Sequence, residues 1–157
     1  MTAAEFALEE FLPYRLSVAA NRTSRLFARR YSEEFGLSIP EWRVLAVVGR
    51  FGGPSASEVV ERTAMDKVKV SRAVRALLGR GLLVRQEDAA DRRVQHLAMT
   101  EEGRRIHTRI LPLARALEAE MLAGIGPEDR AALRRLLDAL DRRLTEMGAE
   151  TGADGLD

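Results

Sequence analysis

The stretch from Ser55 to Gly103 constrains the fold more than any other part of this chain. Its apolar spacing predicts a short helix, a turn at 63–65 and a second helix over about 67–80. Two strand-like runs follow, at 82–87 and 94–99. A helix-turn-helix with a hairpin beside it indicates DNA binding, because such a helix fits a major groove and the hairpin reaches the neighbouring minor groove.

Helical patterns flank this stretch on both sides. Apolar residues at helical spacing predict helices over about 3–35 and 39–50, then from Thr100 to about 122 and from Pro127 onward. Pro13 and Asn21 lie inside the first of these segments, where either could kink or break the helix. The predicted fold class is therefore mainly α with a small β-hairpin wing: a winged helix-turn-helix flanked by N- and C-terminal dimerisation helices.

The same pattern divides the chain into three predicted regions. Residues 36–103 form a winged helix-turn-helix DNA-binding region, residues 1–35 and 104–148 form a helical dimerisation region, and residues 149–157 form a disordered tail. Dimerisation is expected because the last helix carries a wide apolar stripe that one small wing domain does not need. That stripe consists of Leu133, Leu136, Leu137, Leu140 and Leu144.

Composition excludes several classes of protein. The chain has no Cys, so it has no disulfide framework, thiolate metal site or cysteine redox switch. No apolar run is long enough to cross a membrane. Glu5, Glu9 and Glu10 stand where a signal peptide would be basic and then apolar. We therefore expect a cytoplasmic protein with no membrane partner.

Charge is concentrated rather than abundant. The whole chain has a formal net charge of +1. The segment from Asp66 to Arg93 holds eight basic and four acidic residues, a net charge of +4, so the rest of the chain sums to −3. The positive charge coincides with the predicted groove-reading elements, where binding to phosphates would release counterions.

The two faces of the helix predicted over about 67–80 differ in chemistry. Its apolar residues gather on one face at 100° per residue, and we expect that face to be buried. On the other face, arginines suit guanine O6 and N7, an apolar tip suits a thymine methyl, and flanking residues suit phosphates. The predicted base-reading residues are Val68, Arg72 and Arg75, and the predicted phosphate-binding residues are Lys67, Lys69 and Ser71. A solvated basic face of an amphipathic helix is the alternative interpretation.

The predicted hairpin tip carries Asp91, Arg92 and Arg93. The negative potential of a minor groove attracts guanidinium groups, so Arg92 or Arg93 is expected to enter it. Asp91 would orient one of the two arginines by a charge-assisted hydrogen bond. The alternative is ordinary turn chemistry with solvent-exposed charges.

The order of these elements and the sequence of the wing resemble the MarR family of winged helix-turn-helix transcriptional regulators. The wing sequence DRRVQHLAMT, residues 91–100, fits the family pattern D-x-R-x-x-x-L-x-x-T, and Gly103 falls where the family usually has a glycine. The resemblance spans essentially the whole chain. It implies a homodimer that reads a pseudo-palindromic site in double-stranded DNA, with Arg93 as the minor-groove residue and repression favoured over activation.

The resemblance also implies an effector. Members of this family often bind small aromatic or phenolic acids between the dimer helices and the wing domain, and the ligand then releases DNA. Aromatic side chains near a cation would suit an aromatic carboxylate. The candidates are Phe11, Tyr14, Arg15, Trp42 and Arg43. The alternative is that these residues serve as core residues and surface pairs.

The sequence gives no support for an enzyme. No catalytic triad is recognisable, and Gly52-Gly53 lacks the Lys-Ser/Thr of a phosphate-binding loop. His96 and His107 have no carboxylate or thiolate cluster nearby in sequence, so we expect no metal and no cofactor and interpret both as surface or packing histidines. The alternative function is a winged-helix module that binds protein without sequence-specific DNA binding.

Overall fold

The computed structural model describes residues 6–148, and the contacts within it group residues 1–39 and 40–157 into two units. Each unit is described by itself. The segment predicted to be a disordered tail, 149–157, lies outside the described residues. The division into a dimerisation region and a DNA-binding region stays a prediction.

The first unit contains a short 3-10 helix, η1 (Leu8–Glu10), and the long helix α1 (Leu12–Phe35). Pro13 stands in the first turn of α1, where its missing N–H would have no helical partner anyway. The predicted interruption at Pro13 is therefore a helix start, and α1 begins later than the sequence pattern suggested. Gly36 ends α1 in a left-handed conformation, with φ of 61°.

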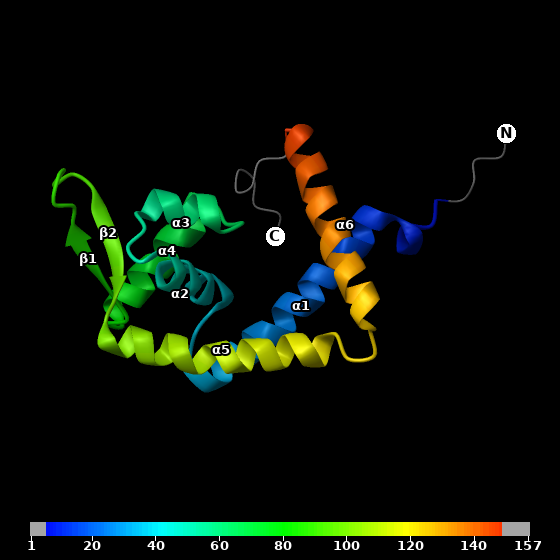
Figure 1. Cartoon of the computed structure of the whole chain (residues 1–157), viewed down its shortest axis with the longest axis horizontal. Helices are drawn as coiled ribbons and strands as arrows, with labels where there is room; N and C mark the ends of the chain where they lie inside the picture. Colours follow the sequence, from blue (N-terminus) through cyan, green and yellow to red (C-terminus); the bar gives the residue numbers. More distant parts are fainter. Residues whose placement is uncertain (1–5, 149–157) are drawn as a thin grey trace. The chain divides into compact units, whose positions relative to one another are not determined.

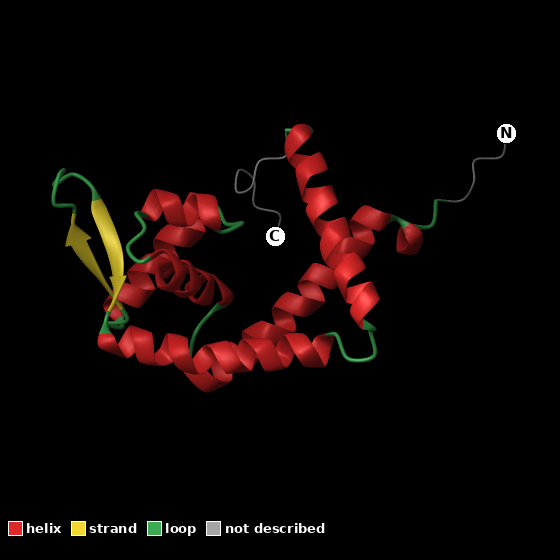
Figure 2. Cartoon of the chain, viewed as in Figure 1, coloured by secondary structure: helices red, strands yellow, loops and turns green. Residues whose placement is uncertain are grey.

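The second unit contains the predicted winged helix-turn-helix and two further helices, and it confirms the predicted fold class. Figure 1 labels these elements and Figure 2 separates the helices from the two strands. In chain order they are α2 (Ile39–Phe51), α3 (Ala56–Arg62), α4 (Lys67–Gly79), β1 (Leu83–Glu87), β2 (Gln95–Met99), α5 (Glu101–Met121) and α6 (Pro127–Glu146).

Local sequence explains where α3 and α4 begin. Ser55 and Glu58 form a capping box, in which the Glu58 amide donates to Ser55 Oγ at 3.2 Å and the Ser55 amide donates to Glu58 Oε2 at 2.7 Å. Asp66 caps α4 by accepting a hydrogen bond from the Lys69 amide at 2.7 Å. The four-residue connection between the two helices holds the buried side chains of Thr63 and Met65. These caps fix the starts of both helices of the helix-turn-helix.

The wing is an antiparallel hairpin in which Leu83 pairs with Met99 and Glu87 pairs with Gln95. A third segment touches it, because Ser55 forms an isolated bridge with His96 and the Leu97 amide donates to the Pro54 carbonyl at 2.9 Å. The chain that leads into α3 is therefore bonded to strand β2. This bonding ties the wing to the helix-turn-helix.

A tight join connects α5 to the turn that follows α4. Thr100 caps α5 by accepting from the Gly103 amide at 3.0 Å, and its hydroxyl donates to the Gly81 carbonyl at 2.7 Å. The Thr100 amide donates to the Leu82 carbonyl at 3.1 Å. A Cβ on Gly103 would collide with the Leu82 carbonyl oxygen. The glycine at this position is thus explained by a close approach of two backbones.

Candidate nucleic-acid interface

Helix α4 has one buried face and one exposed face, as its periodicity predicts. Val70, Ala73, Val74 and Leu77 are buried, and α4 packs against α3 and β1. The other face is exposed to solvent, including 57% of Val68. All six residues that the sequence singles out for DNA are exposed: Lys67, Val68, Lys69, Ser71, Arg72 and Arg75.

The four basic side chains of this face are not neutralised by the protein. Within residues 6–148, neither Lys67, Lys69, Arg72 nor Arg75 forms an ion pair with an acidic side chain. Five residues, Lys67, Val68, Ser71, Arg72 and Arg75, line a shallow hollow of about 300 Å³ along the helix. The arrangement leaves cationic groups available to an external anion.

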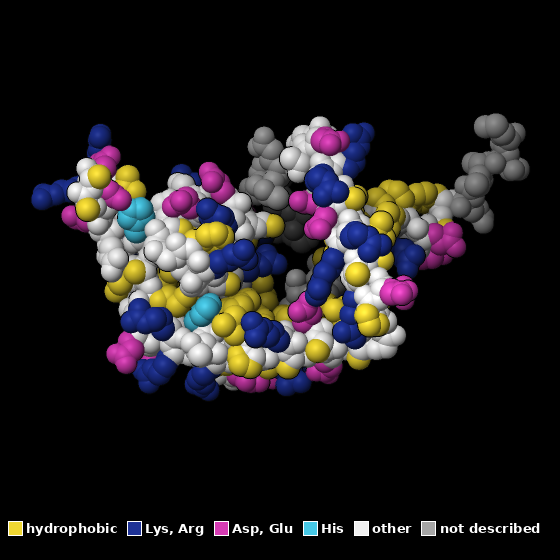
Figure 3. All heavy atoms as spheres, viewed as in Figure 1, with side chains coloured by type: hydrophobic (Ala, Val, Ile, Leu, Met, Phe, Trp, Pro, Cys, Tyr) yellow, Lys and Arg dark blue, Asp and Glu magenta, His cyan; other side chains and the backbone are white. Residues whose placement is uncertain are grey.

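The wing tip brings Asp91 and Arg93 together. Asp91 Oδ1 accepts from the Arg93 amide at 3.0 Å and from Arg93 Nε at 3.3 Å. The rest of the Arg93 side chain projects into solvent, with 91% of it exposed. Arg92 is also exposed. Basic and acidic side chains stand together at the free end of the hairpin in Figure 3.

Arg85 is a residue of this surface that the sequence pattern did not single out. It lies on β1, where its guanidinium donates to Gln95 Oε1 on β2 at 3.1 Å. It lines a hollow of about 360 Å³ with Lys67 and Ser71, and a second of about 440 Å³ with Ser55 and Arg93. Its position is set by strand pairing, so the hairpin register was needed to find it.

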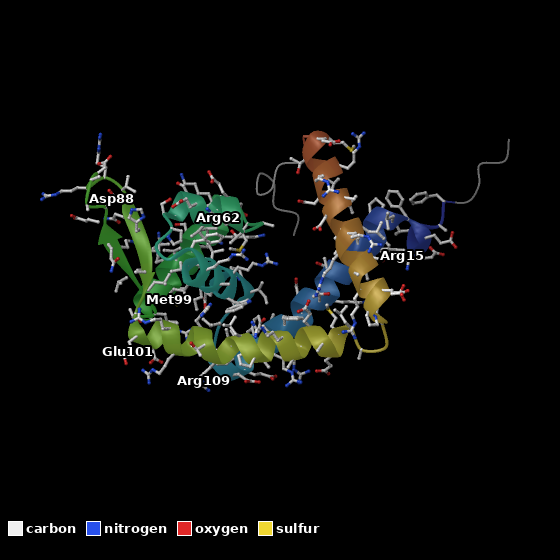
Figure 4. The ribbon with its side chains drawn as sticks, viewed as in Figure 1. Arg15, Arg62, Asp88, Met99, Glu101 and Arg109 are labelled. Carbon is white, nitrogen blue, oxygen red and sulfur yellow. The ribbon has the colours of Figure 1, made fainter. Side chains whose placement is uncertain are left out.

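Asp88 and His96 form a second pair in the wing that sequence reasoning missed. His96 Nε2 lies 2.7 Å from Asp88 Oδ2, and Asp88 Oδ1 accepts from the amides of Ala90 and Asp91 at 2.8 and 3.0 Å. Figure 4 labels Asp88 near the free end of the hairpin. The interpretation of His96 as a surface or packing histidine was incomplete, because its carboxylate partner stands eight residues away and meets it only through the hairpin.

This pairing shifts the titration of both groups. The hydrogen bond with His96, together with those from the Ala90 and Asp91 amides, lowers the pKa of Asp88 to about 2. The Asp88 carboxylate raises the pKa of His96 above its ordinary value, and the Gly53 backbone and the Glu58 charge add to this effect.

The candidate ligand residues fall in both units. In the first unit, Phe11 precedes α1, with its ring centroid 5.2 Å from that of Phe6, while Tyr14 and Arg15 lie exposed in the first turns of α1. In the second unit, Trp42 is half-buried on α2 and Arg43 beside it is exposed. A ligand role for all five stays a prediction.

His107 is the neighbour of Trp42 that the sequence pattern did not indicate. The two rings lie 6.0 Å apart, centroid to centroid. Burial lowers the pKa of His107, which favours a neutral ring at physiological pH. A Cβ added to Gly49 would press on His107 Nε2 and Met99 Cε, at 2.7 and 2.6 Å. His107 therefore packs in a tight cluster between α2 and α5.

Two further observations bound the chemistry of the described residues. No group of three or more His, Asp or Glu side chains in residues 6–148 is arranged to hold a metal ion. None of the described helices is both long enough and apolar enough to span a membrane.

Comparison with known proteins connects this geometry with a family. A family model described as MarR family matches residues 35–94. The chain is 24% identical over 110 residues to the transcriptional regulator HosA of Escherichia coli O127:H6, a match covering 70% of this chain and 82% of HosA. It is 24% identical over 138 residues to the transcriptional repressor NicR of Pseudomonas putida, covering 85% of this chain and 87% of NicR.

The fold has a close counterpart among solved structures. The structure of Bordetella bronchiseptica BpsR, whose DNA binding is described as regulated by 6-hydroxynicotinic acid, aligns with a TM-score of 0.81. The two sequences are 26% identical, and the alignment covers 88% of this chain and 98% of BpsR. The likeness therefore extends along most of both chains.

Proposed function

Because the chain belongs to the MarR family of winged helix-turn-helix transcriptional regulators, which are not enzymes, we propose that it is a dimeric repressor that reads a pseudo-palindromic operator. Two wings on a two-fold axis would bind half-sites about one helical turn apart. Since such a regulator must reach double-stranded DNA, the compartment we propose for it is the cytoplasm.

The observation that carries the proposal is the exposed, unpaired basic face of α4 beside the arginines of the wing tip. We assign Val68, Arg72 and Arg75 to base edges and Lys67, Lys69 and Ser71 to phosphates. Arg93, oriented by Asp91, is assigned to the minor groove with Arg92 beside it. Arg85 on β1, which lines a hollow with Lys67 and Ser71 of α4, adds a further cation for the phosphate backbone.

The exposed apolar side chains of α6 support the proposed dimer. Helix α6 has no buried residue, and 67% of Leu136 is exposed. Four more large apolar side chains of this segment are exposed: Leu133, Leu137, Leu144 and Met147. Monomeric proteins rarely expose so continuous an apolar stripe, and a second copy of the chain is the occupant that the family suggests.

An aromatic or phenolic acid is the effector we propose. BpsR, which resembles this chain in fold and sequence, has its DNA binding regulated by 6-hydroxynicotinic acid. Each unit of this chain offers aromatic rings and a guanidinium group, the chemistry that an aromatic carboxylate needs: Phe11, Tyr14 and Arg15 in the first unit, and Trp42 and Arg43 in the second. A thermal-shift screen of small aromatic carboxylates, followed by DNA release, tests this part.

Selection from random duplexes, followed by sequencing, tests the core of the proposal. A dimeric regulator should enrich a two-fold symmetric sequence, and its affinity should fall steeply as salt rises. Arg72→Ala and Arg93→Ala should each weaken binding by roughly 10- to 100-fold, in keeping with 1–3 kcal/mol for a base contact. Arg105→Ala, which removes an exposed arginine from α5, is the control.

Two results would contradict the proposal. Affinity that ignores salt, or an Arg72→Ala variant that binds its duplex like the unmodified protein, would remove α4 from the interface. Binding of a protein partner at high salt, with no preference among duplexes, would support the winged-helix interaction module instead.

A further inference from the structure

The wing tip is held by a connected set of polar contacts that starts at His96. From His96 the set runs to Asp88, then through the Ala90 and Asp91 amides to the Asp91 carboxylate, and ends on Arg93. The tip closes on itself as well, because the Asp88 amide donates to the Val94 carbonyl at 3.0 Å and the Val94 amide donates to the Asp91 carbonyl at 2.9 Å. Every contact in this set lies within the wing.

His96 is also fixed from the other side. It sits on β2 opposite Gln86, and the bridge with Ser55 ties the same residue to the start of α3. His96 is half-buried, whereas the arginines at the tip are exposed. His96 therefore connects the start of α3 to the turn that carries Arg92 and Arg93.

We propose that Asp88 and His96 are positioning residues: their pair holds the wing-tip turn in the conformation that presents Arg92 and Arg93. The use of that conformation for DNA rests on the proposed function. One Asp88 oxygen shapes the turn and the other binds His96, so this one carboxylate couples tip geometry to the charge of the imidazole ring.

The contact between Asp88 and His96 predicts the direction in which the stability of the wing-tip turn changes with pH. The carboxylates that face His96 are Asp88 from the tip and Glu58 from α3, and both favour the protonated ring. Arg62 acts on Glu58 from the same helix. The pKa of His96 is raised when it is bonded to Asp88. The Asp88–His96 pair, called the clasp below, is therefore strongest below the ordinary histidine pKa of 6.5 and weakens as pH rises through the raised value.

Substitutions can separate the two roles of Asp88. Asp88→Asn keeps an oxygen for the Ala90 and Asp91 amides but removes the charge beside His96, whereas Asp88→Ala removes both. His96→Gln keeps a hydrogen-bond donor and removes the titration. His107→Gln is the control, since His107 is the other histidine of the chain.

The first measurement needs no DNA: NMR titration of His96, with hydrogen exchange at the Ala90 and Asp91 amides. Asp88→Asn should lower the His96 pKa towards 6.5 and leave both amides protected, and Asp88→Ala should free the amides. A His96 pKa that is the same in the unmodified protein and in Asp88→Asn would overturn the proposal. So would equal exchange at these amides in Asp88→Ala.

The second measurement uses the selected duplex at fixed salt. Affinity of the unmodified protein should fall from pH 6 to pH 8, because the His96 ring loses its proton over this range and its bond to Asp88 weakens. His96→Gln and Asp88→Asn should flatten this profile, and His107→Gln should leave it unchanged. If His96→Gln keeps the full pH dependence, the clasp does not position the arginines.

The experiments distinguish failure of the proposed function from failure of the positioning role. If no duplex binds at any pH, the proposed function is wrong, and the NMR titration still decides whether Asp88 and His96 hold the tip. If a duplex binds with the same pH profile in all variants, the proposed function stands and the positioning role is refuted.

Discussion

The substitution Gly103→Ala is expected to destabilise the protein, although alanine is the better helix former. Gly103 lies in the first turn of α5, where replacing Gly by Ala would ordinarily stabilise a helix by up to about 1 kcal/mol. The added Cβ would collide with the Leu82 carbonyl oxygen, which is a backbone atom and cannot turn away. The start of α5 must therefore move away from the turn after α4.

The size of the effect follows from the bonds that such a movement stretches. The Thr100 amide and hydroxyl donate to the Leu82 and Gly81 carbonyls, and each bond is worth about 1 kcal/mol. Overpacking of a close contact adds about 1–3 kcal/mol. After subtracting the gain in helix propensity, the free energy of unfolding should fall by about 2–4 kcal/mol, equivalent to about 5–15 °C in Tm for a chain of this size.

Urea and thermal unfolding followed by circular dichroism measure this loss. Protein concentration must be held fixed, because the stability of a dimer depends on it. Gly79→Ala is the matched control: a Cβ on Gly79 meets no atom within 4 Å, so stability should stay constant or rise by up to about 1 kcal/mol. A Gly103→Ala protein as stable as the parent would refute the close-contact explanation.

Three further predictions concern the helix-turn-helix and the wing. Asp66→Ala removes the cap of α4 and should lower the free energy of unfolding by about 1 kcal/mol in urea titrations, with Asp66→Asn restoring most of it. Leu77→Ala empties a site at the centre of the buried face of α4 and should cost about 2–5 kcal/mol, whereas Val68→Ala on the exposed face should change stability little. The stability difference between the parent and Asp88→Ala should be largest between about pH 4 and 6.5: it should shrink as pH falls from the ordinary Asp value of 3.8 towards about 2, and shrink again as pH rises through the raised His96 pKa. A difference that is constant from pH 3 to pH 9 would contradict that last expectation.

Sequence reasoning succeeded where the determining signal is local. Asp66 is a capping residue directly before a segment of helical periodicity, and Gly81 ends that periodicity. The bounds of α4 could therefore be predicted within about a residue. The wing was recognisable because two short strand-like runs flank a turn. Pro13 was a local signal too, but its position within a long apolar pattern made a helix start look like an interruption.

Contacts that depend on strand register or on two elements meeting were not predictable in this way. Asp88 and His96 stand eight residues apart and meet only because β1 and β2 pair in one register. Arg85 faces Gln95 for the same reason. Gly103 was noticed as a position of the family motif. The reason that glycine is needed there is the Leu82 carbonyl, which lies about twenty residues earlier in the chain.

The join at Thr100 and Gly103 has a mechanical consequence. The start of α5 and the turn after α4 share hydrogen bonds with no room between them, so a displacement at the start of α5 would be passed to that turn. An effector that shifted the first turns of α5 would therefore also shift the turn between α4 and β1. In the proposed dimer, the distance between the two copies of α4 would then depend on the position of α5.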